Sequence, residues 1–374
     1  MAGKSNMNIS IFSKFDMAGG SEFRCVELAN GIAKYTGYKA NLLAERKFPK
    51  KLRSHVVDSV TVIEDCFSQP DYFYESDFIV VINTDAREFS TLDYWMGKSQ
   101  RHSDSLDMEK MRGKTMCFLY NFLVSPCRNL KQLYEYDIDL KIITTNKKFF
   151  DEITKQDRYE DVRIIPRYTL ESPIDPDKLN IFVREPSDTI CFGMHSKRLD
   201  NKWNDEILKL IKEVNGRYNI KNAEPGEDKG DKVDSVKFRF MGIKEGLRNK
   251  VSSFDNVVAM KEDSESVRDF LSNIDVFLFF PDWKREEPWA RVIAEAMVSG
   301  CPVIALDKGG TSDQILKYNN GMLCKNYKDY YKTVINFIEH KEIIPHMSSN
   351  SIRISRSFYS EAVIRRLMGI LNNG

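Results

Sequence analysis

Long apolar runs are missing from this chain of 374 residues, and none approaches the roughly 20 residues that a membrane-spanning helix needs. The polar start, Met1–Met7, predicts no secretory signal. The seven cysteines include no C-x-x-C pair, which argues against a disulfide framework or a cysteine zinc site. Together these absences predict a soluble, cytoplasmic protein with reduced thiols.

Common nucleotide and metal motifs are missing as well. The chain contains neither a P-loop nor a G-x-G-x-x-G turn. Its five histidines lack the spacing of metal ligands. Asp137 and Asp139 form a D-x-D pair, but they lead directly into an apolar run, so we interpret them as a solvated strand entrance. We therefore expect no metal ion and no cofactor, and a formal net charge of +1 excludes attraction of polyanions by the molecule as a whole.

Hydrophobic residues make up 42% of the chain and charged residues 30%, as in globular proteins, and the length suffices for two domains. Short apolar runs predict strands over residues 8–13, 40–44, 78–83, 115–120, 141–145, 189–193, 238–242, 276–280 and 302–306. Helices are expected over residues 21–35 and 361–371, which gives an α/β fold. The predicted organisation is a domain over 1–168, a proline-containing linker over 169–187, a domain over 188–350 and a terminal helical segment over 351–374.

The last two predicted strands enclose two glutamates, Glu287 and Glu295, eight positions apart. Pro288 suits a first helical position and Gly300 the residue just past the end, so the unit is strand, loop, helix, strand. Glu287 should lie at the start of this helix, above the carboxyl end of a strand, with Glu295 about two turns further on the same side. Carboxylates accept hydrogen bonds from sugar hydroxyls, and a helix N-terminus favours phosphate. This anatomy predicts a site for a nucleotide-sugar.

The stretch Glu287-Pro-Trp-Ala-Arg-Val-Ile-Ala-Glu295-Ala-Met-Val-Ser-Gly-Cys-Pro-Val-Ile-Ala305 resembles the signature of retaining glycosyltransferases of family 4. The chain departs from it at Ala290, where glycine is common, and at Val298, where alanine is usual. The resemblance implies the GT-B fold: two Rossmann-like domains facing a central cleft, and a C-terminal helix crossing back to the first domain. It also implies metal-independent transfer of a hexosyl or pentosyl group, with the acceptor in the first domain and the nucleotide-sugar in the second.

The resemblance also implies roles for residues. Glu287 would bind hydroxyls of the donor sugar, while Arg198 and Lys202 would neutralise the leaving diphosphate, with Lys197 as a rival. Thr311 and Gln314 match a capping box after the glycine pair 309–310, and the neighbouring Asp313 holds a position where the family has Glu. His195 is expected to be structural. The donor-binding set is Gly19, Gly20, Lys197, Trp289, Ala290, Glu295 (on the ribose), Gly309, Gly310, Thr311 and Asp313.

Basic residues suggest an anionic acceptor. One group follows the second predicted strand: Arg46, Lys47, Lys50, Lys51 and Arg53. A second group mixes aromatic and basic residues: Tyr94, Trp95, Lys98 and Arg101, followed by Lys110, Arg112 and Lys114. We expect both groups on loops after strands, on the cleft side, where they suit a surface glycan or a lipid-linked saccharide. They equally suit a base flipped out of DNA and stacked on Trp95 or Tyr94, as in phage DNA glycosyltransferases, or a charged loop without a partner.

Other functions of the same fold remain as alternatives. The chain could be a non-catalytic nucleotide-sugar binder, an epimerase or a phosphorylase. A degenerate binder is expected to lose a polar element of the donor site, whereas Glu287, Glu295 and both glycine pairs are present here. A transferase is therefore the favoured function, with the sugar, the nucleotide, the acceptor and the oligomeric state left open.

Overall fold

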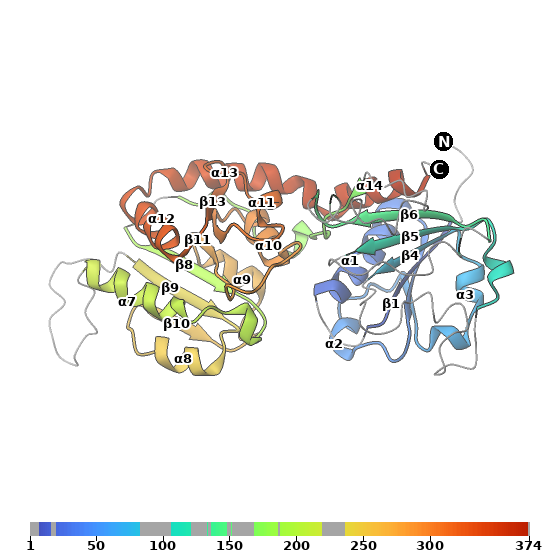
Figure 1. The fold of residues 1–374 in the computed structure, drawn as a ribbon, viewed down its shortest axis with the longest axis horizontal. Helices are drawn as coiled ribbons and strands as arrows, with labels where there is room; N and C mark the ends of the chain where they lie inside the picture. The colour runs from blue at the N-terminus through green and yellow to red at the C-terminus, as the bar shows by residue number, and fades with distance from the viewer. Residues whose placement is uncertain are drawn as a thin grey trace. The chain divides into compact units, whose positions relative to one another are not determined.

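The computed structural model describes residues 7–15, 20–82, 106–120, 133, 136–147, 151, 168–185, 188–218 and 236–372. The chain forms two compact units, Met1–Pro173 with Phe358–Gly374, and Ile174–Ser357 (Figure 1). Each unit is built on a parallel sheet of its own. The predicted α/β fold with two Rossmann-like sheets is confirmed; the cleft between the two domains stays a prediction.

Within the described residues, the first unit has a parallel sheet of seven strands in the order β3-β2-β1-β4-β5-β6-β7. The strands are β1 (Asn8–Ser13), β2 (Lys39–Ala44), β3 (Val60–Ile63), β4 (Phe78–Ile82), β5 (Thr115–Tyr120), β6 (Asp139–Thr144) and β7 (Tyr168–Thr169). The α-helices are α1 (Gly20–Thr36), α2 (Lys50–Arg53), α3 (Asp71–Tyr74) and α14 (Ser360–Asn372). Short 3-10 turns cover Cys66–Ser68 and Met108–Met111.

The central strand β4 shows why this sheet is buried on both faces. All of its residues are buried and apolar, the pattern of a parallel strand covered on both sides. Val80 packs into the core formed with α1 and α14, while its neighbour Val81 packs into the core on the opposite face. Because side chains alternate along a strand, one short apolar run contributes residues to two separate cores.

The C-terminal helix α14 belongs to the first unit, as predicted. Val363, Ile364 and Leu367 are fully buried in the core that β1 and α1 share. Gly31 of α1 lets the two helices approach, because a Cβ at this position would lie 2.7 Å from Cγ1 of Ile364. The packing of α14 on α1 can be followed in Figure 1.

Within its described residues, the second unit has a parallel sheet of six strands in the order β10-β9-β8-β11-β12-β13. The strands are β8 (Ile190–His195), β9 (Val236–Met241), β10 (Val257–Met260), β11 (Val276–Phe279), β12 (Val303–Leu306) and β13 (Gly321–Cys324). The helices are α7 (Glu206–Tyr218), α8 (Glu245–Val251), α9 (Val267–Ser272), α10 (Arg291–Val298), α11 (Thr311–Gln314), α12 (Tyr327–Glu339) and α13 (Ile343–Ser355). Turns of 3-10 helix cover Pro176–Lys178, Asp200–Lys202 and Arg356–Phe358.

The strand order of the second sheet identifies its ligand-binding edge. The chain runs outward from β8 to β9 and β10, then returns to the other side of β8 with β11. The carboxyl ends of β8 and β11 are therefore the point where open α/β sheets bind ligands.

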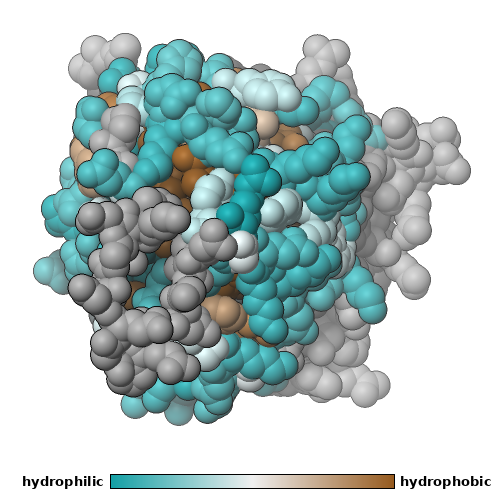
Figure 2. All heavy atoms as spheres, turned by 90° about the vertical axis from the view of Figure 1, so that its left-hand side faces the viewer, coloured by the Kyte–Doolittle hydropathy of each residue, from teal (hydrophilic) through white to brown (hydrophobic). Residues whose placement is uncertain are grey.

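Figure 2 shows one face of the molecule, on which hydrophilic side chains predominate and hydrophobic ones form small separate patches.

Four short strands, β3, β7, β10 and β13, were not predicted from the sequence. Each has four residues or fewer and lies at an edge of its sheet. Their apolar runs are too short or too mixed to distinguish from loops by periodicity alone. Part of the predicted linker also differs from a solvated segment, since Ile174 and Arg184 are buried.

Arg184 joins the ends of two helices in the second unit. Its guanidinium is buried and donates to the carbonyl oxygens of Leu271 at 2.8 Å and Ser299 at 3.0 Å. These carbonyls lie at the C-termini of α9 and α10, where the helix dipole favours a cation. Its backbone N–H donates to Ser348 Oγ at 2.8 Å, which ties the same segment to α13.

We predict that Arg184→Met lowers the free energy of unfolding of the second unit by about 3 kcal/mol, because buried carbonyls lose charged donors. The free energy of unfolding of Arg184→Lys should fall between those of the wild type and Arg184→Met, since one ammonium cannot replace the planar fork of donors that a guanidinium provides. Calorimetry of the full chain measures the transition. Arg217→Met is the control, because its pair with Glu339 is about half exposed and contributes little. A normal transition in Arg184→Met would contradict this role.

Candidate functional site

The candidate site lies at the carboxyl ends of β8 and β11. The loop after β8 contains Lys197, Arg198 and Lys202, and the loop after β11 leads to Glu287. The two loops are joined directly, since the backbone N–H of Asn204 donates to the carbonyl oxygen of Phe280 at 3.2 Å. Basic and acidic residues that are far apart in sequence are thereby brought to one edge of the sheet.

Glu287 is 9% exposed, and two cations meet one of its oxygens. Lys202 Nζ and Arg285 Nε both donate to Glu287 Oε1, the latter at 2.5 Å. Burial raises the pKa of Glu287, but Lys202 and Arg285 lower it by more, so the carboxyl stays ionised with a pKa below its ordinary value. The pKa of Lys202 is also lowered, chiefly by burial and partly by Arg285, although Glu287 opposes this. The cluster carries two positive charges against one negative charge.

The structure thus brings together Lys202 and Glu287, two of the predicted site residues, whereas Arg285 was missed by the sequence reasoning. The sequence could have indicated Arg285, because it lies only two residues before Glu287 in the same loop. Arg198, expected beside Lys202, has a side chain 54% exposed and donates to Glu245 Oε2 at 2.6 Å. Lys197 contributes its carbonyl oxygen to Trp203 Nε1 at 3.1 Å, and the buried Trp203 anchors this loop in the core.

The backbone at Glu287 is held by the glycine pair that follows β12. Gly310 donates to the carbonyl oxygen of Glu287 at 2.8 Å. Gly309 has a φ of +60°, and a Cβ there would overlap that same carbonyl oxygen. The close approach that was predicted for a ligand is therefore made by the protein's own backbone.

Helix α10 begins at Arg291, three positions later than Pro288 predicts, so Glu287 lies in the loop before the helix. The reason is Gln314, which bonds both backbone groups of the N-cap residue Ala290 at 3.0 Å. The predicted capping box of Thr311 and Gln314 is wrong for the same reason. Gly310 is the N-cap of α11, and the Thr311 hydroxyl donates to the carbonyl oxygen of Leu306 at 2.7 Å.

The end of α10 agrees with the prediction. Gly300 follows the last turn with a φ of +86°, a left-handed conformation that favours glycine. Its N–H donates to Met297 O at 3.0 Å, and that of Cys301 donates to Ala296 O at 2.8 Å. These two bonds form a Schellman motif, which directs the chain into β12.

Glu295 lies on α10 beside His195, the last residue of β8. Arg291 Nε donates to Glu295 Oε1 at 2.8 Å, and His195 Nε2 lies 3.6 Å from Glu295 Oε2. Burial lowers the pKa of His195 to about 3, helped by Arg291, so the imidazole is neutral near pH 7 and forms no ion pair. Burial also raises the pKa of Glu295, although Arg291 opposes this. The His195 ring packs edge-on against Phe270 at 5.5 Å, as expected of a structural residue.

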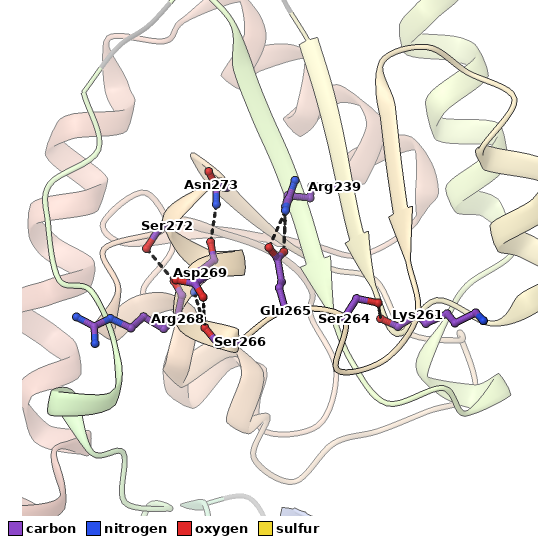
Figure 3. Close-up of polar contacts among 9 residues, drawn as sticks. All are labelled: Arg239, Lys261, Ser264, Glu265, Ser266, Arg268, Asp269, Ser272 and Asn273. Atoms are coloured by element: carbon purple, nitrogen blue, oxygen red, sulfur yellow. Dashed lines mark hydrogen bonds and ion pairs between the residues drawn. The ribbon is translucent and has the colours of Figure 1, made fainter.

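The neighbouring loop after β10 is also held in place (Figure 3). Arg239 of β9 forms a bidentate pair with Glu265, with the shorter contacts at 2.8 Å. Ser266 caps α9 by accepting from the backbone N–H of Asp269 at 3.0 Å. On the same loop, Glu262 accepts from the backbone N–H of Arg198 at 3.0 Å. The loops after β8 and β10 are therefore linked.

The other predicted donor residues fall in different environments. Trp289 and Ala290 are buried beside Glu287, and Asp313 is exposed on α11. Gly20 is exposed at the first position of α1, whereas Gly19 lies outside the described residues. The roles of these five residues stay predictions.

The basic group after β2 is exposed at the carboxyl end of that strand. Arg53 is partly neutralised, since its guanidinium pairs with Glu64 at 2.6 Å. The exposed members are Arg46, Lys47, Lys50, Lys51 and Arg53. The first part of the second predicted group, Tyr94, Trp95, Lys98 and Arg101, lies outside the described residues.

The remainder of the second group was predicted at the wrong end of the sheet. Lys114 directly precedes β5, and its ammonium donates to the carbonyl oxygen of Ser76, just before β4, at 2.8 Å. Arg112 is paired with Glu109 at 2.9 Å. Since parallel strands share their direction, these residues lie at the amino-terminal edge, opposite the carboxyl ends.

Across the described ranges, no group of three or more His, Cys, Asp or Glu side chains could hold a metal ion. No helix in the described part of the chain is long and apolar enough to cross a bilayer. Burial raises the pKa of the Cys301 thiol to about 11 and that of Cys117 to about 12, so neither is a thiolate near neutral pH.

We predict that His195→Gln changes the acid sensitivity of the protein. Unfolded histidine binds a proton near pH 6.5, whereas folded His195, with a pKa of about 3, does not. Wild-type stability should therefore fall on acidification below pH 6.5, by about 1.4 kcal/mol per pH unit from this group. Urea unfolding between pH 5 and 6.5 should show a shallower slope in the variant.

The control for this measurement is His340→Gln, because the His340 side chain is 55% exposed. Glu295 and Arg291, the charged groups beside His195, are present in both proteins. Equal slopes in wild type and His195→Gln would contradict the buried neutral imidazole.

Comparison with known proteins identifies relatives of this fold. The family model of glycosyl transferases group 1 matches residues 229–353. Anabaena HepE in complex with UDP and glucose is similar over 98% of this chain and 100% of its own, with a TM-score of 0.66 and 14% identity. A glycosyltransferase from Rickettsia africae is similar over 99% of this chain and 100% of its own, with a TM-score of 0.70 and 12% identity.

TarM from S. aureus, solved with Fondaparinux, alpha-GlcNAc-glycerol and UDP, is similar over 99% of this chain and 100% of its own. Its TM-score is 0.66 and its identity 9%. None of the curated proteins compared with the chain matches it. At these identities the solved structures establish the fold, while the family match covers the segment that contains Glu287 and Glu295. The prediction that the chain is a glycosyltransferase of GT-B fold is thereby confirmed, with a glycosyl transferases group 1 match in its second unit.

Proposed function

We propose that the chain is a retaining, metal-independent glycosyltransferase of family 4 that moves a sugar from a nucleotide-sugar to an acceptor hydroxyl. The observation that carries the proposal is the contact of Lys202 with Glu287 at the switch point of the second sheet. It brings a cation suited to a diphosphate and an ionised carboxylate suited to sugar hydroxyls to one place. Both residues lie in the unit that contains the family match.

In this proposal each group has a separate task. Glu287 accepts hydrogen bonds from the donor sugar, and Glu295 from the ribose. Lys202 compensates the charge that grows on the leaving diphosphate, with Arg198 as the second predicted cation. The remaining donor contacts are proposed at Gly19, Gly20, Lys197, Trp289, Ala290, Gly309, Gly310, Thr311 and Asp313.

The donor is proposed to be a nucleoside diphosphate sugar. HepE was solved with UDP-glucose, which makes UDP-sugars the first to test. A screen of common UDP-, GDP- and ADP-sugars for released nucleotide identifies the donor without knowledge of the acceptor. Adding EDTA tests metal independence, and NMR of the product anomer tests retention. Tight donor binding without nucleotide release or transfer would favour a non-catalytic binder.

We propose an anionic acceptor, because five basic side chains are exposed at the carboxyl end of β2. A surface glycan or a lipid-linked saccharide fits this charge. A hydroxymethylated base in DNA is the second candidate, since the same charges suit a phosphate backbone.

We predict that Glu287→Gln reduces nucleotide release and sugar transfer by about 100-fold or more, because it removes several kcal/mol of charge and hydrogen bonding. The matched control is Glu286→Gln, an exposed carboxylate next to it in the same loop, which should keep near-normal turnover. Both variants are assayed with the donor found in the screen. Normal transfer by Glu287→Gln would reject the assignment of the site.

We predict that binding to an anionic acceptor depends on Lys47 and Lys50. The double variant Lys47→Gln/Lys50→Gln should weaken acceptor binding and reduce its dependence on salt, because fewer phosphates or carboxylates are neutralised. Duplex DNA and an anionic glycan are compared by fluorescence anisotropy over a salt series. Absence of binding to DNA at low salt would dismiss the DNA candidate. If the double variant kept the salt dependence of the wild type for both ligands, the basic residues after β2 would not bind the acceptor.

A further inference from the structure

Arg285 is a cation of the candidate site for which the sequence assigned no role. It lies in the loop after β11, and its Nε donates to Glu287 Oε1 at 2.5 Å. Lys202 Nζ donates to that same oxygen. Because both nitrogens contact one atom, they lie within the span of two hydrogen bonds, close enough to serve neighbouring oxygens of one diphosphate.

The guanidinium of Arg285 has donors to spare. A guanidinium carries five N–H donors in a planar fork. Of the N–H groups of the Arg285 guanidinium, only the Nε–H has a hydrogen-bond partner within the described residues, and this partner is Glu287. The side chain is 21% exposed, so it is partly desolvated yet accessible from solvent. Such a fork matches phosphate bidentately.

Arg198, in contrast, is directed elsewhere. Its guanidinium donates to Glu245 at 2.6 Å, and its backbone N–H donates to Glu262 at 3.0 Å. The Arg198 and Glu245 side chains are 54% and 57% exposed. Lys202 and Arg285, each 21% exposed, are thus the pair of cations that converge on Glu287.

We propose that Arg285, rather than Arg198, binds the donor's diphosphate together with Lys202, and that Glu287 is their internal counter-ion until the donor arrives. This inference rests on the proposed function of the site. One carboxylate against two cations leaves one positive charge, which a diphosphate can neutralise. Exchange of the carboxylate for phosphate frees Glu287 to accept hydrogen bonds from the donor sugar.

The proposal separates nucleotide binding from sugar transfer and can be tested with product nucleotides alone. Binding of UDP, GDP, ADP and inorganic pyrophosphate to the full chain is measured by titration calorimetry. Arg285→Gln should weaken the best-bound nucleoside diphosphate by about tenfold or more, the effect of losing a charged hydrogen bond. Arg198→Gln, which removes the cation that the sequence assigned to this role, should weaken it by less than about threefold. Arg285→Lys should restore part of the affinity.

Glu287→Gln supplies a readout that a purely structural Arg285 would not produce. Removing the competing carboxylate should tighten nucleoside diphosphate binding several-fold, although transfer is lost in the same variant. Far-ultraviolet circular dichroism and the thermal midpoint confirm that each variant is folded.

Two results would overturn the inference while leaving the proposed function intact: a larger loss of affinity in Arg198→Gln than in Arg285→Gln, or no gain of affinity in Glu287→Gln. If the wild-type chain binds none of the nucleoside diphosphates, the proposed function fails and takes this inference with it.

Discussion

A buried carboxylate must be paired, and this constraint organises the candidate site. Removing the charge of Glu287 from water costs several kcal/mol unless opposite charges compensate it. Lys202 and Arg285 provide this compensation from two different loops. The positions of both loops therefore depend on the same carboxylate, and the excess positive charge they leave is what makes the site suited to an anion.

The scaffold around this cluster is built from direct links between loops. Gly242 after β9 donates to Met260 at the end of β10 at 3.1 Å, and Ser196 after β8 donates to Met241 at the end of β9 at 3.1 Å. Gln314 on α11 accepts from the backbone N–H of Ala290 and so fixes the N-cap of α10. A site supported in this way can hold its charged groups near one geometry before a ligand binds, which reduces the cost of ordering them.

Much of this arrangement was accessible from the sequence, because parallel strands are apolar on both faces and end at one edge. The runs that became β1, β5 and β11 were predicted nearly residue by residue. The resemblance to retaining glycosyltransferases, in contrast, assigned Lys202 and Glu287 to one donor site. The ion pair of Arg198 with Glu245 and the start of α10, which Gln314 sets, were not predictable. Glu245 and Gln314 are distant in sequence from their partners, and no local pattern specifies the loop paths that bring them together.

The contact between Gly309 and Glu287 has a consequence for how this chain can vary. Glu287, whose carboxylate is proposed to bind the donor sugar, is positioned partly by the absence of a side chain at Gly309. Substitution at position 309 should therefore alter the same property as substitution at 287, with effects that do not add. We therefore expect positions 287 and 309 to tolerate substitution jointly rather than independently.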